Sequence, residues 1–431
     1  MKKILIITYY WPPAGGPGVQ RWLKFTKYLP EFGYKPHVYI PENPSYPIID
    51  ETLVKDINPK LKIVKNKIWE PYQLAEKLNP KNKSYKGGHF EKKEAQSFMS
   101  KLSIFIRGNF FIPDARKFWI KPSIQFLKEY LEKEGIDTIV TSGPPHSMHL
   151  IGLGLKELNP NLKWIADFRD PWTQISYHKE LKLTPWAAKK HEDLEYAVMT
   201  KANLVLATSY SDGDNFKKIG TKNVEVITNG FEEVKQETEK DQEFFHITYS
   251  GGLEMLRNPF SLWKAIHQLT KSNSSFKNDL KLNFYGSLAD DVKQTIIDED
   301  LSSNLIVHGY VSHQESLNAI NKANVLLLTN FDNVASKGII PGKLFEYMAT
   351  GNPILAIGPK DADVERILNK TKAGEYFNHQ EVENIKTMIL NIYNQWLANP
   401  NVKFDTNENE VKQFNRKNLT KQLVTAIEKF Y

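Results

Sequence analysis

Glycines and ionisable side chains recur directly after short apolar runs of this sequence, a pattern that suits the binding of phosphate groups. The first such segment follows Ile4–Thr8 and contains Gly15, Gly16 and Gly18. Glycine lets the backbone approach a ligand closely, and free N–H groups at the start of a helix attract anions. A tight strand-to-helix turn without a ligand is the alternative. Arg21 stands where a dinucleotide-binding fingerprint has its third glycine, so the spacing disfavours a nicotinamide cofactor.

Two later segments place a histidine and an aspartate in the same kind of position. His146 and Asp170 each come a few residues after a strand-like apolar run. An imidazole there can donate a hydrogen bond to a phosphate or to a sugar hydroxyl. The alternative for His146 is a local role beside a helix cap formed by Ser142 or Ser147. For the two aspartates that flank Arg169, the alternative is that they only organise a loop.

The second half of the chain repeats the pattern with stronger cations. Ser250 and Gly251 end an apolar run, and Arg257 follows, a residue that suits bidentate phosphate binding. Lys343 opens a helical pattern, where it can meet a diphosphate, and Glu346 one turn later can accept from two ribose hydroxyls. The alternatives are a surface arginine and an exposed ion pair between Lys343 and Glu346, which contributes only some tenths of a kcal/mol.

Metal and thiol chemistry are disfavoured. The sequence has no cysteine, which excludes a thiol nucleophile and Cys-ligated zinc. Two Asp-x-Asp pairs, Asp212 with Asp214 and Asp361 with Asp363, each open a predicted helix, where aspartates cap the helix and complement its dipole. We therefore expect no metal site and no cofactor.

Apolar runs typical of strands alternate with helical patterns along both halves, and this alternation predicts elements that position the site residues. The runs are Ile4–Thr8, His37–Ile40, Thr138–Thr141, Trp164–Asp167, Leu204–Ala207, Val224–Ile227, Phe245–Ser250, Leu282–Tyr285, Leu305–Val307, Val325–Leu328 and Ile354–Ile357. Strands joined through helices form parallel sheets covered on both faces. A length of 431 residues suits more than one domain.

The expected fold class is therefore α/β, with two facing doubly wound Rossmann-like domains and a cleft between them, because such sheets bind ligands at the carboxyl ends of their strands. The first domain should span residues 1–235, with an insertion at about 70–120, and the second should span 243–407. A helix over 408–431 should pack back on the first domain. The polar stretch 232–242 is the expected linker.

Charge is distributed unevenly between the two halves. Residues 1–240 contain 37 Lys and Arg against 28 Asp and Glu, whereas the rest contain 20 against 22. Such an excess suits an anionic partner, or it is a solvated lysine-rich surface. Lys81, Lys83 and Lys86 lie beside Tyr85 without an acid among them, a run that suits an anionic membrane surface or an ordinary solvated loop. Nucleic-acid binding is disfavoured, because this is the one basic run with an aromatic side chain.

Several of these motifs together resemble the family 4 glycosyltransferases of the GT-B architecture, over nearly the whole chain. The most specific is Lys343–Pro353, KLFEYMATGNP, which resembles the donor-binding helix and the start of the next strand. The loop with Gly15 and Gly16 resembles the family's N-terminal loop, and Ile227–Phe231 resembles the turn before its second domain. The segments around His146 and Asp170 resemble a subgroup often found with surface-polysaccharide genes.

The resemblance implies a role for each matching residue. The amides of Gly15 and Gly16 would face the donor diphosphate, with Gly18, Ser250 and Gly251 also at the donor. Arg257 matches the family's phosphate-binding cation, Lys343 would add charge, and Glu346 would hold the ribose. His146 would touch the donor sugar.

Two positions depart from the family pattern. Gly338 stands where the family has an acidic residue, eight positions before Glu346, and this leaves the donor sugar open. Gly252 stands where the family has an arginine, which weakens the phosphate clamp unless Lys343 or Arg21 takes its place.

The implied activity is retaining, metal-independent transfer of a sugar from a nucleotide-sugar, with UDP the family's usual nucleotide, to a glycan or lipid-linked glycan. The implied setting is surface-polysaccharide synthesis in the cytoplasm, at or near the inner face of the membrane. One alternative is a nucleotide-sugar epimerase that uses Asp170 and His146 as its acid/base pair. Another is a non-catalytic sugar- or nucleotide-binding module.

Overall fold

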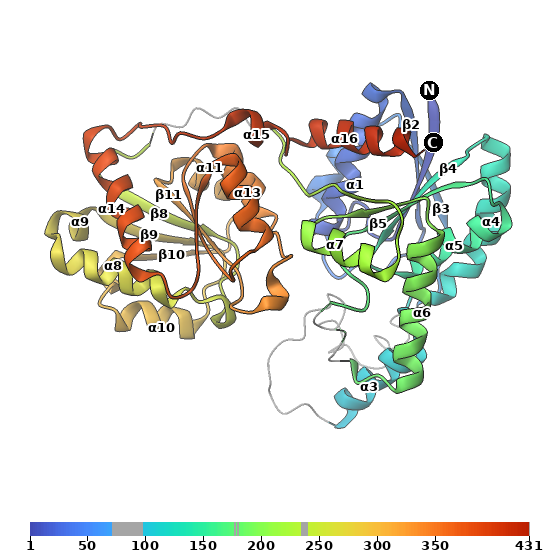
Figure 1. The fold of residues 1–431 in the computed structure, drawn as a ribbon, viewed down its shortest axis with the longest axis horizontal. Coiled ribbons are helices and arrows are strands. Elements are labelled where there is room, and N and C mark those ends of the chain that lie inside the picture. Colours follow the sequence, from blue (N-terminus) through green and yellow to red (C-terminus); the bar gives the residue numbers. More distant parts are fainter. Residues whose placement is uncertain (71–97, 176–177, 179–180, 234–239, 431) are drawn as a thin grey trace. The chain divides into compact units, whose positions relative to one another are not determined.

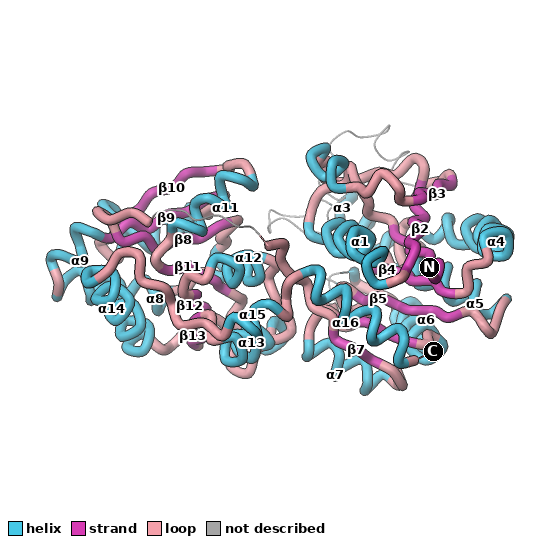
Figure 2. The backbone as a smooth tube through the Cα atoms, turned by 90° about the horizontal axis from the view of Figure 1, so that it is seen from above, coloured by secondary structure: helices cyan, strands magenta, loops and turns pink. Residues whose placement is uncertain are grey.

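The structure is a computed structural model that describes residues 1–70, 98–175, 178, 181–233 and 240–430. Its contacts divide the chain into two compact units (Figure 1). Unit 1 comprises Met1–Thr228 together with Leu419–Tyr431, and unit 2 comprises Asn229–Asn418. In both units, parallel strands lie between layers of helices (Figure 2).

Unit 1 is built on a seven-stranded sheet with the order β3-β2-β1-β4-β5-β6-β7, and every neighbouring pair is parallel. Its strands are β1 (Lys2–Thr8), β2 (Tyr34–Pro41), β3 (Lys62–Asn66), β4 (Thr138–Gly143), β5 (Lys163–Phe168), β6 (Leu204–Ala207) and β7 (Val224–Val226). The central strands β1, β4 and β5 are buried along nearly their whole length because both of their faces are covered.

Helices cover the two faces of this sheet separately. The helices of unit 1 are α1 (Pro17–Tyr28), α3 (Phe98–Phe110), α4 (Lys117–Glu134), α5 (Ser147–Leu158), α6 (Pro185–Lys201), α7 (Tyr210–Ile219) and α16 (Arg416–Lys429), and α3 packs beside α6 and not on the sheet. Ile4 and Ile6 pack with side chains of α1 and α16, whereas Leu5 and Ile7 pack with α4, α5 and α6. Alternate residues of one strand thus form the cores on its two faces.

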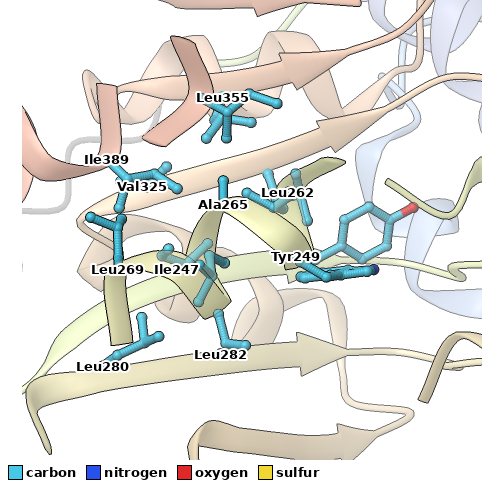
Figure 3. Close-up of a cluster of buried hydrophobic side chains, with 14 of the residues drawn as sticks. Ile247, Tyr249, Leu262, Ala265, Leu269, Leu280, Leu282, Val325, Leu355 and Ile389 are labelled. Carbon is cyan, nitrogen blue, oxygen red and sulfur yellow. The ribbon is translucent and has the colours of Figure 1, made fainter. Parts of the chain in front are cut away.

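Unit 2 contains a six-stranded parallel sheet with the order β10-β9-β8-β11-β12-β13. Its strands are β8 (Phe245–Ser250), β9 (Leu280–Tyr285), β10 (Leu305–Gly309), β11 (Val325–Thr329), β12 (Ile354–Ile357) and β13 (Gly374–Phe377). Its helices are α8 (Phe260–Ser272), α9 (Ser274–Asp279), α10 (Asp290–Asp298), α11 (His313–Lys322), α12 (Lys343–Thr350), α13 (Asp363–Thr371), α14 (Val382–Ala398) and α15 (Glu408–Lys412). Ile247, Leu282 and Val325 pack against Leu262 and Leu269 of α8 (Figure 3).

Every strand expected from an apolar run is present, but β3 and β13 were not predicted. Both lie at the edge of a sheet, where a strand is only half covered and needs no continuous apolar run. The expected helix over 408–431 is two helices, α15 and α16, and only the part from Leu419 onward belongs to unit 1.

The first domain was expected to end at residue 235 and the second to begin at residue 243. In the structure the division falls earlier, between Thr228 and Asn229. Most of the expected insertion, residues 71–97, lies outside the described residues, and so do Lys81, Lys83, Tyr85 and Lys86. The described remainder contains α3 and the start of α4.

Candidate functional site

The candidate residues of unit 1 follow three adjacent strands at the carboxyl edge of the sheet. The strand order changes direction between β1 and β4, and ligands of doubly wound folds bind at such a switch point. The segment after β1 contains the glycines, the turn after β4 contains His146, and the segment after β5 contains Asp170. The fold therefore brings these three predicted segments to one edge.

Within the first segment, the structure separates the roles of Gly15 and Gly16. The Gly15 N–H donates to the Ile48 carbonyl at 2.9 Å, and a Cβ on Gly15 would lie 2.8 Å from the Ile48 side chain. The prediction that the Gly15 amide faces a diphosphate is therefore wrong, because the amide is already bonded. Gly16 precedes α1 with a φ of 93°, and a Cβ there would meet nothing within 4 Å. The open backbone expected of a ligand-binding loop is thus found at Gly16.

Gly18 is needed for contact with Arg169. A Cβ on Gly18 would collide with the Arg169 guanidinium, whose Nη1 donates to the Gly18 carbonyl at 2.7 Å. The same guanidinium donates to the carbonyls of Gly143 and Pro144. Arg169 therefore ties together the segments that follow β1, β4 and β5, a positioning role that the sequence pattern left open.

A buried ion pair lies below these segments. Arg21 is 2% exposed and donates from Nε and Nη2 to Asp167, at 3.0 and 2.9 Å to Oδ1. Its Nη1 donates to the carbonyls of Ile227 and Thr228. Asp167 also accepts from Ser142 Oγ. Because the pair is enclosed and fully hydrogen-bonded, Arg21 does not take the place of the arginine missing at position 252.

The turn that contains His146 is held by an aspartate from another part of the chain. Asp114 accepts from both the N–H and the hydroxyl of Ser147, at 2.9 and 2.8 Å. The side chain of Ser142 is bonded to Asp167. Helix α5 thus begins without a side-chain cap from its own preceding residue, so the cap by Ser142 or Ser147 that was the alternative role for this segment is not formed.

His146 itself is 6% exposed and stacks on Trp172, with ring centroids 4.7 Å apart and planes 4° from parallel. Neither of its ring nitrogens has a hydrogen-bond partner within the described part of the chain. Burial first, and the neighbouring His149 second, hold the pKa of His146 well below its ordinary value. The ring is therefore a neutral imidazole whose polar atoms are left for a ligand or a water molecule.

Asp170 lies on the surface and has no hydrogen bond to His146 among the described residues. The acid/base pair that an epimerase would need is therefore not assembled from these two side chains here.

Sequence reasoning missed the histidines that surround His146. His149 is buried, its Nδ1 lies 2.9 Å from Thr141 Oγ1, and burial lowers its pKa to about 3. His191 accepts from Trp172 Nε1 at 3.0 Å, and burial lowers its pKa to about 4. The spacing of His146 and His149, three residues apart at a helix start, was the available signal, since it places both on one face.

The loop after β2 is supported by a second buried carboxylate. Glu70 accepts from the Tyr9 hydroxyl at 2.8 Å and from the Ser45 N–H at 2.9 Å, and it pairs with Arg116 at 3.1 Å. This cluster holds Ser45, and Ile48 in the same loop accepts from the Gly15 N–H.

In unit 2 the strand order changes direction between β8 and β11, and the candidate residues surround the carboxyl end of β8. The Ser250 N–H donates to the Tyr347 hydroxyl at 2.9 Å, and Ser250 Oγ lies 2.6 Å from Ser316 Oγ. Gly251 has a φ of 107°, and a Cβ there would lie 2.9 Å from Lys343 Nζ. Ser250 therefore joins β8 to α11 and α12, while Gly251 leaves room for the lysine.

Lys343 is directed toward β8 and not toward Glu346. Its Nζ lies 3.8 Å from the centroid of the Tyr249 ring. Burial first, and the charge of Arg257 second, lower the pKa of Lys343 to about 7, while Glu346 opposes the shift. No ion pair joins Lys343 to Glu346 in the described structure, so the surface salt bridge considered from the sequence is not formed. Glu346 Oε1 lies 3.9 Å from His313 Nε2.

Arg257 approaches the same loop from the short helix Met255–Arg257. Its Nη2 donates to the Gly252 carbonyl at 2.9 Å, a carbonyl that also accepts from the Tyr249 hydroxyl. Its Nε is buried without a hydrogen-bond partner among the described residues. Two cations therefore converge on the loop after β8 with an N–H still to be satisfied, an arrangement that suits an anion.

Gly338 lies between the short helix Val334–Ser336 and α12. Its neighbours are held in place, because the Lys337 carbonyl accepts from the Asp363 N–H and the Ile339 carbonyl accepts from Asn330 Nδ2. A glycine brings no carboxylate to this loop, so the acid that the family pattern expects has no counterpart at position 338.

Among the residues that the structure describes, no group of three His, Cys, Asp or Glu side chains is placed to hold a metal ion. None of the helices described is both long enough and apolar enough to cross a membrane.

No family model and no curated protein matches this sequence. Solved structures match its fold along the whole chain. A glycosyltransferase from Rickettsia africae ESF-5 has 13% identity and a TM-score of 0.62, covering 100% of this chain and 99% of that one. An α,α-trehalose-phosphate synthase (UDP-forming) from Burkholderia vietnamiensis has 8% identity and a TM-score of 0.56, covering 100% of both chains.

A Listeria monocytogenes protein described as a UDP-N-acetylglucosamine 2-epimerase is also similar, with 12% identity and a TM-score of 0.52, covering 99% of this chain and 96% of that one. Identities this low show the fold alone. The predicted fold class, two parallel-sheet α/β domains of the GT-B kind, is confirmed. Glycosyltransferases predominate among the similar structures.

Proposed function

We propose that this protein is a retaining glycosyltransferase whose unit 2 binds a nucleotide-sugar, with UDP as the nucleotide. The observation that carries the proposal is the pair of cations at the end of β8. Lys343 has a lowered pKa and no carboxylate partner in the described structure, and Arg257 has an unsatisfied N–H beside it. A diphosphate would supply both with hydrogen-bond acceptors and negative charge.

The same cations account for the chemistry. A sugar leaves its nucleotide through an oxocarbenium-like transition state, and negative charge grows on the departing diphosphate. Arg257 and Lys343 would stabilise that charge because they are held in place before the reaction starts. A phosphate oxygen would accept the proton of the acceptor hydroxyl, so no separate base is required. Glu346 would orient the ribose through its hydroxyl groups.

Unit 1 would bind the acceptor, and Gly16 and His146 are its proposed contacts with the substrates. The neutral imidazole of His146 can donate to a sugar hydroxyl from one nitrogen and accept with the other. The excess of positive charge in the first half supports an acceptor that carries anionic groups, such as a lipid-linked glycan at the inner face of a membrane. Synthesis of a surface polysaccharide would consume such a product.

The test is product analysis after incubation with several UDP-sugars and a lipid-linked glycan fraction. The proposal predicts free UDP and a new glycosidic bond with the anomeric configuration of the donor, and both should be lost in Arg257→Met. An epimerised nucleotide-sugar without transfer would identify the epimerase, and an unchanged donor that nevertheless binds would identify a binding module.

A further inference from the structure

The helix α3 presents its apolar side chains outward. Phe110 is 63% exposed, and Leu102, Phe105 and Ile106 lie on the same side of the helix at spacings of three to four residues. Ile104 on the opposite side is buried. A helix at a protein surface usually has the reverse arrangement, with its apolar stripe toward the core.

The buried side of α3 is fixed by specific contacts. A Cβ on Gly108 would lie 2.8 Å from the Leu181 carbonyl, so the helix packs closely on this segment. Asn109 accepts from the Thr184 N–H at 2.7 Å and donates to the Lys182 carbonyl at 3.3 Å. The outward direction of the apolar side chains is thus set by packing.

Exposed aromatic side chains continue the surface beyond α3. Trp69 and Phe118 meet edge to face with centroids 4.7 Å apart, and both are exposed. Trp186, in the first turn of α6, is 67% exposed and lies two residues after Thr184, which bonds α3. We name the set the α3 patch, which consists of Trp69, Leu102, Phe105, Ile106, Phe110, Phe118 and Trp186.

Lysines lie beside this patch on two segments. Lys117 Nζ lies 5.2 Å from the Phe118 ring centroid and donates to the Phe110 carbonyl. Lys182 and Lys190 are exposed on the segment that α3 packs against. Residues 98–121 contain a single acid, Asp114, and its carboxylate is engaged with Ser147.

We propose that the α3 patch docks on the surface of an anionic lipid bilayer. Aromatic and aliphatic side chains favour the boundary between headgroups and acyl chains, and lysines beside them attract acidic headgroups. A second copy of the chain would instead bring two sets of lysines together. The inference rests on the proposed membrane contact, and it assigns that contact to α3, Trp69, Phe118 and Trp186.

The experiment measures binding of the full chain to vesicles of phosphatidylcholine with a quarter phosphatidylglycerol, and to vesicles of phosphatidylcholine alone. The test variant is Phe105→Ser with Ile106→Ser, two exposed positions. Its matched control is Leu158→Ser with Leu397→Ser, which are 57% and 55% exposed elsewhere on the chain. We expect the test variant to bind anionic vesicles at least about tenfold more weakly and the control to bind like the original protein.

Thermal stabilisation by UDP, measured on the same samples, separates this inference from the transferase proposal. A retained UDP response together with lost vesicle binding supports the α3 patch as the lipid contact. Equal vesicle binding by the test variant overturns the inference. The inference is also overturned if no protein sample binds vesicles and the original protein forms a dimer in solution that the test variant dissociates. Neither result bears on the proposed donor site.

Discussion

The Lys343→Met substitution should change the pH dependence of stability in a direction fixed by the lowered pKa. The folded protein holds the pKa of Lys343 at about 7, against an ordinary value of 10.5. The unfolded chain therefore binds more protons between these two values, and stability rises with pH across that window. Below about pH 7 the full cost of burying the charged ammonium is present.

The size of this cost follows from the pKa difference. If the whole pKa difference acts on folding, burial of the charged lysine lowers the free energy of unfolding by on the order of 4 to 5 kcal/mol below about pH 7. Lys343 retains some exposure, so roughly 2 to 4 kcal/mol is expected. Methionine has a similar length and no charge. The variant should accordingly be more stable than the original protein at about pH 6 by several degrees in its melting temperature, with the difference shrinking toward pH 10.

The assay is thermal unfolding of both proteins across this pH range, without nucleotide and then with UDP in excess. Lys264→Met, an exposed lysine on α8, is the matched control and should give a profile parallel to that of the original protein. With UDP present the order should reverse near pH 7, because a diphosphate stabilises the charged lysine. Parallel profiles for Lys343→Met and the original protein would refute the assignment of a desolvated, partnerless ammonium.

Three further changes have definite expected outcomes. Arg21→Met leaves Asp167 buried without its partner and should lower the free energy of unfolding by about 3 to 5 kcal/mol in urea titration; a loss below about 1 kcal/mol would contradict the buried pair. Gly251→Ala forces a side chain into a φ of 107° and should cost about 1 to 2 kcal/mol while weakening UDP binding in calorimetry. His146→Phe keeps a ring that can stack on Trp172, so melting should change little while sugar transfer falls, and full transfer would exclude His146 from the substrate.

The two doubly wound units were predictable because buried parallel strands are continuous apolar runs, and loops between them punctuate the pattern. The edge strands β3 and β13 were not predicted, because Lys62 and Glu375 face solvent in strands that are half covered. The division of the C-terminal segment into α15 and α16 was not predicted either, because no proline or glycine marks the interruption at Gln413–Asn415.

The candidate site was predictable in its location and less so in its bonding. Strand ends in the sequence located Gly16 and His146 at the carboxyl edge of the sheet, and the start of a helical pattern located Lys343. The sequence could not show that the Gly15 N–H donates to the Ile48 carbonyl, or that Arg21 forms a buried ion pair with Asp167. Those partners lie far away in the chain. Long-range pairs of this kind are set by tertiary packing, which spacing along one segment does not report.

The proposed donor site requires that unit 2 bind the diphosphate of a nucleotide-sugar through Lys343 and Arg257. The most direct measurement is the melting temperature with UDP, GDP, ADP, CMP or NAD in large excess. A ligand at about 100 times its dissociation constant contributes about 2.7 kcal/mol, which raises melting by several degrees. We expect such a rise with one nucleoside diphosphate, and we expect it to be reduced in Arg257→Met and in Glu346→Ala. A rise with NAD alone, or a rise that both variants retain in full, would contradict it.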